Sequence, residues 1–595
     1  MHSTAAWIAS LLALIAAVAP PPAPQPTAAG NAPATDRSEA SIVDRDPIDL
    51  ALLPGNRALV VNRLGNSVSL VDLARGRIVR EFPVGARPFA IAVAADRVVA
   101  TVRGAHTVAV IDTRSWTVRQ VPVGREPRGV AMSSDGRRAW VACSDDDTVA
   151  EVDLDRGMVV RRTPVGREPW HVATTPDNRL LAVASPRTRE VAVLDTRTLG
   201  VVRTVRTAGR NVRRIALDPA GRYAYFPMIS ERLAPADRVN IDRGWVVGNR
   251  LARIDMTKDS PREAVTLDSL GAGVADVDGC AVAPDGSALA LAASGSHELV
   301  LIEHPARLPF VSYGGPGDHI DPDTRSRTTR IPIAGAPVAC RFTADGTGIW
   351  ISERFGNRLL HVDRRTRRVD RTIALPAPAA SPTRLGEAIF HDASRSFGGW
   401  YSCASCHVEG HTGGGLFDTL NDGGYGKPKL TPSLRGAART APFTWHGWQN
   451  RLEDAVGESF VKSMQGPAPS ADDVDRVVRW ISTLESPASP EPVTPLARSG
   501  AVVFRAKGCA QCHAGPDFTS PLRMRVGLES DDDHFEGFNP PSLRNVRQRG
   551  PWLHDGRANS LEAVVTEHHS PSKLGIGSDC VPGEVRALVA YLKTL

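Results

Sequence analysis

The sequence has little cysteine, no long hydrophobic run and almost no excess of charge. Its 595 residues include only 8 cysteines, too few for a disulfide scaffold of this size. No apolar run reaches the roughly 18–20 residues of a membrane-spanning helix, so we expect no span in the mature chain. The formal net charge is only +6, without a dense basic block, which argues against nucleic-acid binding. The length predicts several domains, because one core rarely exceeds about 250–300 residues.

The N-terminus carries an apolar stretch, Ala5–Ala19, followed by a Pro-rich segment. This pattern is typical of a secretory signal, although no Lys or Arg precedes Arg37. We predict a signal peptide over residues 1–29, a Pro/Ala-rich linker over residues 30–45, and export to the periplasm or the cell exterior. A short uncleaved anchor is the alternative.

Internal repeats dominate the next part of the chain. Similar sequence segments recur about 40 residues apart, and this spacing is the length of one four-stranded propeller blade. They begin at Val84, Val123, Val165 and Ala208. Seven turns separate short runs rich in Val, Ala and Ile, as expected of hairpin strands. The pattern predicts a seven-bladed β-propeller over residues 46–375, and the repeats resemble the YVTN family of propeller repeats.

Two CxxCH sequences follow the propeller. Two thiols three residues apart can both form thioethers with one haem, whose iron the adjacent histidine then ligates. A zinc site is the alternative, but no second CxxC lies nearby to complete four ligands. We therefore predict two covalently attached c-type haems, held by Cys403, Cys406 and His407 and by Cys509, Cys512 and His513. We expect the other cysteines to be unpaired, namely Cys143, Cys280, Cys340 and Cys580.

The region around these motifs is itself duplicated. Thr431–Arg435 after the first motif matches Pro540–Arg544 after the second, and each copy closes with an apolar-periodic segment. The repeat predicts two mainly α-helical cytochrome c lobes, at residues 383–486 and 495–595. The whole chain is therefore predicted to be multidomain, with an all-β seven-bladed propeller followed by two mainly α lobes.

The segment FNPPSLRNVRQRGPWLHDGRANSLEAVVTEHH, at Phe538–His569, resembles the C-terminal lobe of bacterial di-haem cytochrome c peroxidases and their relatives that oxidise protein side chains. The resemblance covers about residues 383–595. It implies a C-terminal haem that takes electrons from a small cytochrome c or cupredoxin and passes them to an N-terminal haem, where peroxide is reduced. It also implies a calcium ion between the lobes, whose ligands the sequence does not identify.

The resemblance also suggests distal iron ligands. It places the ligand of the C-terminal haem at His568, with His569 beside it. For the N-terminal haem, Met464 is the candidate, with core packing as its alternative role. His411, Tyr425 or an open iron position remain alternatives there.

Further residues are assigned roles by the same comparison. Peroxide cleavage needs an acid or base above the iron, and the family's glutamate is replaced here by Ser463. The nearest carboxylates are Glu453 and Glu458; Glu453 has a counterpart in the other lobe and is expected to be structural, so Glu458 is the candidate. His554 is expected beside a ligand or at the interface between the lobes. Arg435 and Arg544 are expected to pair with haem propionates, or with protein carboxylates.

Three classes of function remain open. The leading prediction is an exported di-haem oxidoreductase of the peroxidase type, whose propeller docks a protein partner or binds substrate. The second is a non-catalytic di-haem electron-transfer protein whose propeller binds a redox partner. The third places catalysis in the propeller, as a dehydrogenase that delivers electrons to the haems.

Overall fold

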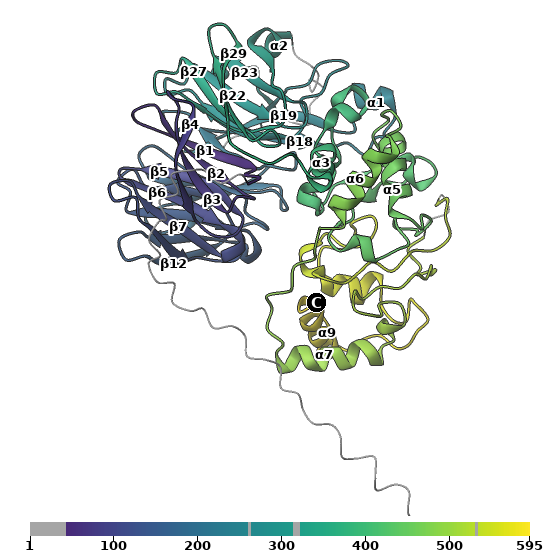
Figure 1. Ribbon diagram of the computed structural model, residues 1–595. Coiled ribbons are helices and arrows are strands. Elements are labelled where there is room, and N and C mark those ends of the chain that lie inside the picture. The colour runs from purple at the N-terminus through teal and green to yellow at the C-terminus, as the bar shows by residue number, and fades with distance from the viewer. Residues whose placement is uncertain (1–42, 260–262, 313–321, 530–532) are drawn as a thin grey trace, which may run out of the picture. The chain divides into compact units, whose positions relative to one another are not determined.

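The computed structural model describes residues 43–259, 263–312, 322–529 and 533–595 (Figure 1). The predicted signal peptide over residues 1–29, and most of the linker that follows it, lie outside these residues. In the described ranges, no helix combines the length and the apolar character that a membrane span requires.

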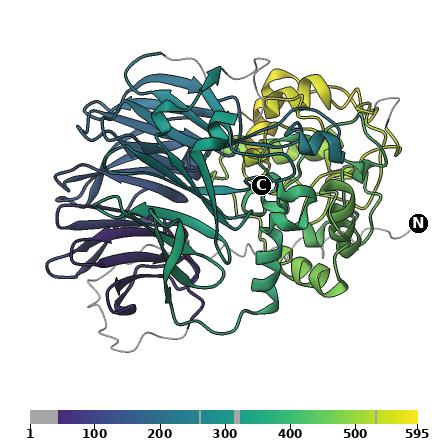
Figure 2. The same cartoon turned by 90° about the horizontal axis from the view of Figure 1, so that it is seen from above.

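Seven antiparallel sheets in the described part of the chain form the predicted propeller. The first four blades are β1 (Pro47–Leu53), β2 (Arg57–Asn62), β3 (Ser67–Asp72) and β4 (Arg77–Pro83); β5 (Pro88–Ala94), β6 (Arg97–Val102), β7 (Thr107–Asp112) and β8 (Val118–Pro122); β9 (Pro127–Met132), β10 (Arg138–Cys143), β11 (Thr148–Asp153) and β12 (Met158–Pro164); β13 (His171–Thr174), β14 (Leu180–Ser185), β15 (Glu190–Asp195) and β16 (Val201–Arg206). The last three are β17 (Ala216–Leu217), β18 (Tyr223–Ser230), β19 (Gly248–Asp255), β20 (Glu263–Thr266) and β24 (Val311–Ser312); β21 (Val277–Val282), β22 (Ala288–Ala293), β23 (Glu298–Glu303) and β25 (Thr328–Pro332); β26 (Pro337–Phe342), β27 (Gly348–Glu353), β28 (Arg358–Asp363) and β29 (Arg368–Ala374). The blades can be followed from purple to teal in Figure 1 and from above in Figure 2.

The sequence pattern of each strand follows its place in the blade. Middle strands are packed between neighbouring blades on both faces, and so they read as continuous apolar runs. In β2, for example, the side chains from Ala58 to Val61 are fully buried. The outermost strand β12 instead alternates between exposed and half-buried residues. Cys143, Cys280 and Cys340 lie in this core, and all eight cysteines of the chain, each within the described residues, are free.

The ring closes between its first and last blades. Asn357, in the turn between β27 and β28, accepts hydrogen bonds at its Oδ1 from the amides of Arg45 and Asp46, at 3.0 and 2.9 Å. These residues directly precede β1. Asn357 therefore ties the last blade to the residues that precede the first, without a disulfide.

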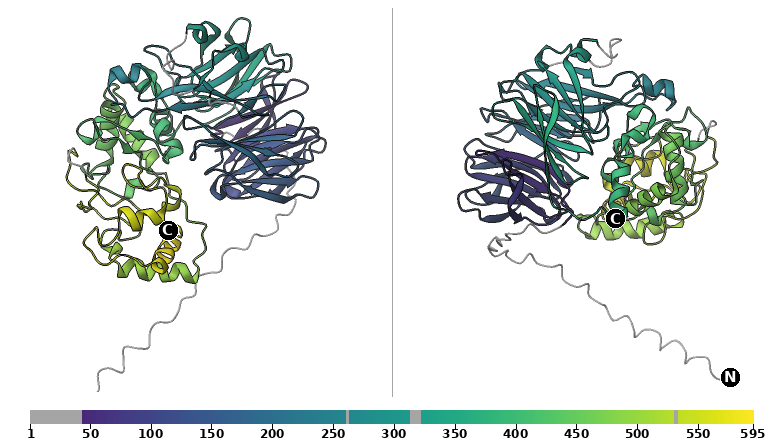
Figure 3. Two further views of the ribbon diagram at one scale, coloured as in Figure 1. Left: turned by 180° about the vertical axis from the view of Figure 1, so that it is seen from behind. Right: turned by 45° about the horizontal axis from the view of Figure 1, so that its top comes forward.

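Helices and loops make up the duplicated lobes, and two short helices, α1 and α2, lie in propeller insertions. The helices are α1 (Arg238–Asp242), α2 (Pro322–Arg327), α3 (Pro382–Phe390), α4 (Cys403–Cys406), α5 (Leu452–Glu458), α6 (Ala471–Ile481), α7 (Pro495–Ala506), α8 (Leu561–Ala563) and α9 (Pro582–Lys593). A two-stranded sheet, β30 (Leu416–Phe417) and β31 (Lys429–Leu430), completes the first lobe. The same elements are seen from behind in Figure 3.

The first and last helices of each lobe cross in close contact. A Cβ atom on Gly386 of α3 would overlap the carbonyl oxygen of Arg476 on α6, and one on Gly500 of α7 would overlap that of Ala587 on α9. Only glycine permits this approach of two backbones. The equivalent positions of the two glycines show that both lobes use the same packing.

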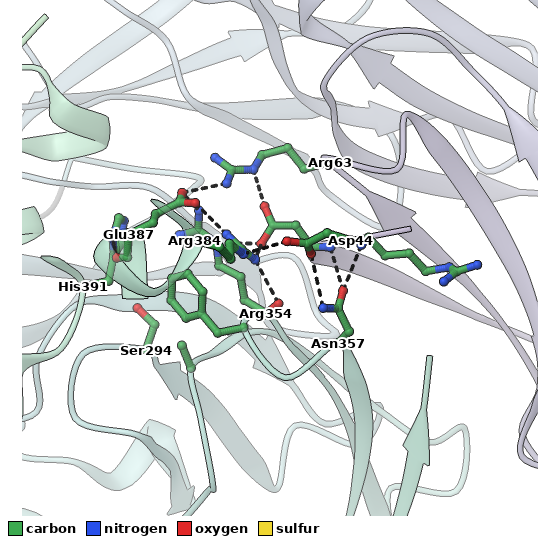
Figure 4. A network of polar contacts seen from close by, with 12 residues as sticks. Asp44, Arg63, Ser294, Arg354, Asn357, Arg384, Glu387 and His391 are labelled. Carbon is green, nitrogen blue, oxygen red and sulfur yellow. Dashed lines mark hydrogen bonds and ion pairs between the residues drawn. The ribbon is translucent and has the colours of Figure 1, made fainter. Parts of the chain in front are cut away.

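A buried ion network joins α3 to the propeller, as Figure 4 shows. Asp46 is bound by Arg63, Arg354 and Arg384. Glu387 of α3 is bound by the same three guanidinium groups, with Arg63 at 2.7 Å and Arg384 at 2.6 Å. Burial alone would raise the pKa of Asp46, but the three arginines together lower it well below its ordinary value. Both carboxylates are therefore ionised in the folded chain at neutral pH.

Candidate haem sites

The first CxxCH motif forms the single helical turn α4, and Ser402 is its N-cap. Ser402 Oγ accepts a hydrogen bond from the Ala404 amide at 3.0 Å, while the Ser402 amide donates to Ser405 Oγ at 2.9 Å. These reciprocal bonds fix the turn. Both thiols of Cys403–Cys406 are half-buried and line one cavity.

His407 follows this turn and lines the same cavity. Its Nδ1 lies 2.9 Å from the carbonyl oxygen of Pro432. A carbonyl only accepts, so Nδ1 carries the hydrogen and Nε2 keeps a free lone pair. Burial lowers the pKa of His407 to about 4, and the neutral imidazole that results is the form that ligates a metal ion.

The second motif repeats this arrangement. Cys509 begins a short 3₁₀ turn, η10 (Cys509–Gln511), and Cys512 and His513 follow. His513 Nδ1 lies 3.1 Å from the carbonyl oxygen of Phe518, and burial lowers the pKa of this histidine. Each predicted iron ligand thus has its tautomer set by a backbone carbonyl.

The cavity at the first motif has a volume of about 380 Å³ and receives residues from both lobes. Met464 lines it, only 4% exposed, and its Sδ lies 3.6 Å from Cys403 Sγ. From the second lobe, Pro540 and Arg549 complete the wall. The second lobe therefore takes part in the first site.

Two half-buried arginines, Arg435 and Arg549, line this cavity. Arg435 makes no ion pair in the described part of the chain, and burial lowers its pKa. Arg549 has no carboxylate partner there either; its Nη1 donates to the Ser542 carbonyl oxygen at 2.7 Å. Burying a cation without a counter-ion is costly. The pair therefore fits a ligand with acidic groups, such as the propionates of a haem.

Each lobe places a π-helical turn just before a candidate distal ligand. In the first lobe, the turn η9 (Ser459–Ser463) continues α5 and ends at Met464. In the second, the turn η12 (Val564–His568) continues α8 and ends at His569. Such single π turns occur frequently at functional sites. Met464 and His569 thus each directly follow a π turn.

The neighbouring histidines His568 and His569 have different surroundings. His568 Nε2 lies 3.9 Å from Glu567 Oε2, and its side chain is 26% exposed. His569 has a buried Nδ1 without a hydrogen-bond partner. Burial lowers the pKa of His569 to about 4, and the nearby His513 contributes. The geometry therefore favours His569 over the predicted His568 as the distal group.

Two alternative ligands for the first site have other partners. His411 is buried, with Nδ1 2.8 Å from Ser433 Oγ and Nε2 3.4 Å from the Gln548 carbonyl oxygen. Tyr425 donates its hydroxyl to the Ala236 carbonyl oxygen at 3.2 Å. Of the candidates, Met464 is the one that lies in the cavity wall beside the attachment turn.

The candidate acid Glu458 lies outside the cavity wall. It forms an ion pair with Lys462 at 2.7 Å on the exposed side of the helix. Asp422 does line the cavity, and burial raises its pKa. Gln449 also lines it, with a buried Oε1 that has no hydrogen-bond partner. Sequence reasoning missed these two residues, because they reach the cavity from segments without a recognisable motif.

Stacked rings connect the lobes. His446 of the first lobe stacks on Phe538 of the second at 4.6 Å, and Phe538 stacks on His554 at 4.4 Å. Trp445 lies 6.3 Å from His554, edge to face. The structure thus places His554 where the two lobes meet.

Other expectations remain untested by these contacts. Arg544 donates to the Pro516 carbonyl oxygen at 2.7 Å and lies over the ring of Phe518. In the described ranges, no group of three or more His, Cys, Asp or Glu side chains is placed to hold a metal ion. The propionate role of Arg544 and the calcium ion stay predictions.

Comparison with known proteins supports the reading of both regions. Residues 380–486 match the family described as di-haem cytochrome c peroxidase, and residues 92–224 match the family described as cytochrome D1 heme domain. The predicted resemblance to di-haem peroxidases and the propeller architecture are confirmed. Within the propeller, the matched residues 92–224 belong to the second to fifth blades.

Three curated relatives are similar to the chain over about a third of its length. Methylamine utilization protein MauG of Methylorubrum extorquens is 28% identical over 38% of this chain and 83% of its own. Hydrazine synthase subunit gamma of Kuenenia stuttgartiensis is 27% identical over 36% of this chain and 77% of its own. Cytochrome c551 peroxidase of Nitrosomonas europaea is 24% identical over 36% of this chain and 80% of its own.

Proposed function

We propose that this protein, whose residues 380–486 match the di-haem cytochrome c peroxidase family, is an exported oxidoreductase of that type. The second site receives electrons from a small cytochrome c or cupredoxin, and peroxide is reduced at the first. The observation that carries the proposal is the difference between the two sites. The cavity of the first is lined by a thioether, Met464, and by an acid, Asp422, whereas the second offers an imidazole, His569.

The residues present fit one haem at each site. Cys403, Cys406 and His407 would hold the first, and Arg435 and Arg549 would neutralise its propionates. Cys509, Cys512 and His513 would hold the second. Bound there, the two haems would supply iron centres that accept and donate single electrons.

Two polar residues of the first cavity would handle the proton of peroxide. Asp422 is a carboxylate whose raised pKa suits a group that takes up and returns a proton. Gln449 Oε1 is an acceptor without a partner, and it would orient a hydroxyl group of the substrate. Met464, whose Sδ lies 3.6 Å from Cys403 Sγ, would supply a thioether ligand to a haem held at the first site.

The second site would hold its haem iron with the imidazoles of His513 and His569. His513 and His569 lie near each other, and two imidazole ligands give a low-spin iron with a lower potential than a His/Met pair. The stack from His446 through Phe538 to His554 lies between the lobes. We propose that electrons pass from the second site to the first through this region.

Optical and electron paramagnetic resonance spectra of the oxidised and half-reduced protein test the proposal. We expect one low-spin centre in both states and a second that becomes high-spin on half-reduction and then reacts with hydrogen peroxide. Two low-spin centres that resist both peroxide and cyanide would overturn the peroxidase assignment. That result would establish the electron-transfer alternative, which the burial of Met464 favours.

Export also belongs to this proposal. Covalent haem attachment of this kind normally takes place outside the cytoplasm. N-terminal sequencing of the mature holoprotein should begin near residue 30, and fractionation should recover the haem protein in the periplasm. A mature chain that retains residues 1–29 would show an uncleaved anchor instead.

A further inference from the structure

The propeller binds directly to the first haem-attachment turn. Asp276, which precedes β21 and is 5% exposed, accepts hydrogen bonds from Ser402 Oγ at 2.5 Å and from Ser405 Oγ at 2.8 Å. Asn211 of the propeller donates its Nδ2 hydrogen to the Ser405 carbonyl oxygen at 2.8 Å. These three bonds hold both serines of the sequence Ser-Cys-Ala-Ser-Cys-His.

A second propeller contact lies just beyond the iron ligand. Glu409 is two residues past His407 and adopts a left-handed backbone conformation, with φ 51°. Its carboxylate accepts from Arg103 Nη1 at 3.0 Å and from Arg128 Nη2 at 2.8 Å. The attachment turn is thus held from both ends.

Other propeller residues orient the two guanidinium groups of this contact. The Arg128 guanidinium lies 3.7 Å above the centre of the Trp170 ring. Arg103 is held by Glu126 at 2.7 Å, and stacking and pairing of this kind orient a guanidinium before it binds. In the described part of the chain, no propeller residue forms a comparable bond to Cys509–His513, and the second lobe meets the propeller only through other segments.

From these contacts we infer that the propeller forms part of the first haem site. Asp276, Arg103 and Arg128 are positioning residues, which fix the attachment turn and set the reduction potential of the first haem without affecting the second. The inference rests on the proposed function. A buried carboxylate near an iron centre favours the oxidised state, whereas a buried guanidinium favours the reduced state, because charges act strongly in a medium of low dielectric constant.

Redox titration of the complete holoprotein, followed optically at each haem, tests the inference. In Glu409→Gln, we expect the first-haem potential to rise, with a threefold to tenfold change in the equilibrium constant for reduction; tenfold corresponds to 59 mV for one electron. In Arg128→Gln, we expect a shift of similar size in the opposite direction. Arg128→Lys keeps the charge and should restore most of the wild-type potential.

The controls separate a local effect from loosened structure. Glu151 is a buried propeller carboxylate held by Arg138 and Arg161, so Glu151→Gln should leave both haem potentials unchanged. The second haem is an internal control in every variant. Shifts of the same sign in Glu409→Gln and Arg128→Gln, or no shift at the first haem, would overturn the inference.

The same preparations distinguish this failure from failure of the proposed function. The pyridine haemochrome spectrum gives the number of covalent haems per chain. Two haems with unshifted potentials would overturn the inference alone. A first site without haem would overturn the proposed function, and this inference with it.

Discussion

The guanidinium of Arg435 in the first lobe lies beside that of Arg549 in the second. Burial lowers the pKa of Arg549 to about 10, and the like charge of Arg435 contributes to the shift. Like charges repel each other, and an anion in the first cavity, which both residues line, would offset this repulsion. An acidic ligand in this cavity would therefore contact an arginine from each of the two lobes.

This pair gives a first prediction about the holoprotein. Replacing Arg435 by Gln should remove a partner of a buried propionate and lower the free energy of unfolding by about 3 kcal/mol. Arg451→Gln serves as the control, because Arg451 is 69% exposed and its pair with Glu453 is worth less than about 1 kcal/mol. Urea unfolding, monitored by the Soret band, measures both. Equal losses in the two variants would contradict a propionate role.

The second prediction separates the neighbouring histidines of the second lobe. His569→Ala should convert the second iron from low-spin to high-spin, because it removes a distal imidazole. His568→Ala should leave the spectrum unchanged, because His568 faces Glu567. Electron paramagnetic resonance at low temperature measures the spin state. Loss of the low-spin signal in His568→Ala would restore the original prediction from the sequence.

Much of this architecture could be predicted because its signals are local. Blade length, hairpin turns and the two CxxCH motifs are short patterns, each with one structural meaning. The choice between His568 and His569 was harder, since a π turn shifts the phase of the helix and the usual spacing no longer applies. Asp422 could not be found at all, because its loop reaches the cavity only after the lobes have folded.

The third prediction concerns Asp422 and peroxide turnover. If its carboxylate takes the proton from peroxide, Asp422→Asn should lower the rate of peroxide reduction by about 10²–10⁴-fold. Glu458→Gln should retain nearly full activity, because Glu458 pairs with Lys462 outside the cavity. A stopped-flow assay with excess peroxide measures each rate.

The pH profile provides a further test of this role. Burial raises the pKa of Asp422 above its ordinary value of 3.8, and the ionised form is the base. Wild-type activity should therefore rise with pH through this elevated pKa. The acid limb should disappear in Asp422→Asn, and its persistence there would assign the proton transfer to another group.

The fourth prediction concerns the ion network that joins α3 to the propeller. Burial alone would raise the pKa of Glu387, but Arg63, Arg354 and Arg384 lower it well below its ordinary value. Because the pKa is lower in the folded chain than the roughly 4.3 expected of the unfolded one, ionised Glu387 stabilises the fold above about pH 4. This contribution is lost as the pH falls towards the folded-state pKa.

Replacing Glu387 by Gln should therefore make the free energy of unfolding depend less on pH under acidic conditions. The variant should lose about 3–5 kcal/mol at pH 7, where three guanidinium groups are left with one buried carboxylate, and less near pH 3. Urea unfolding from pH 3 to pH 7 gives both slopes. Glu453→Gln, at a half-exposed position, should follow the wild-type curve. Parallel curves for Glu387→Gln and wild type would show that the network contributes no pH dependence.

The fifth prediction tests the close helix crossing of the first lobe. In Gly386→Ala, the new methyl group would overlap the Arg476 carbonyl oxygen, so α3 and α6 must separate at a cost of about 1–3 kcal/mol. Gly457→Ala is the matched control. Gly457 lies in α5 with open space around it, and alanine there should stabilise the helix by about 0.4–1 kcal/mol. Opposite signs in urea unfolding would show that backbone contact, rather than helix propensity, requires glycine at position 386. Stabilisation in both variants would mean that the two helices can move apart without loss.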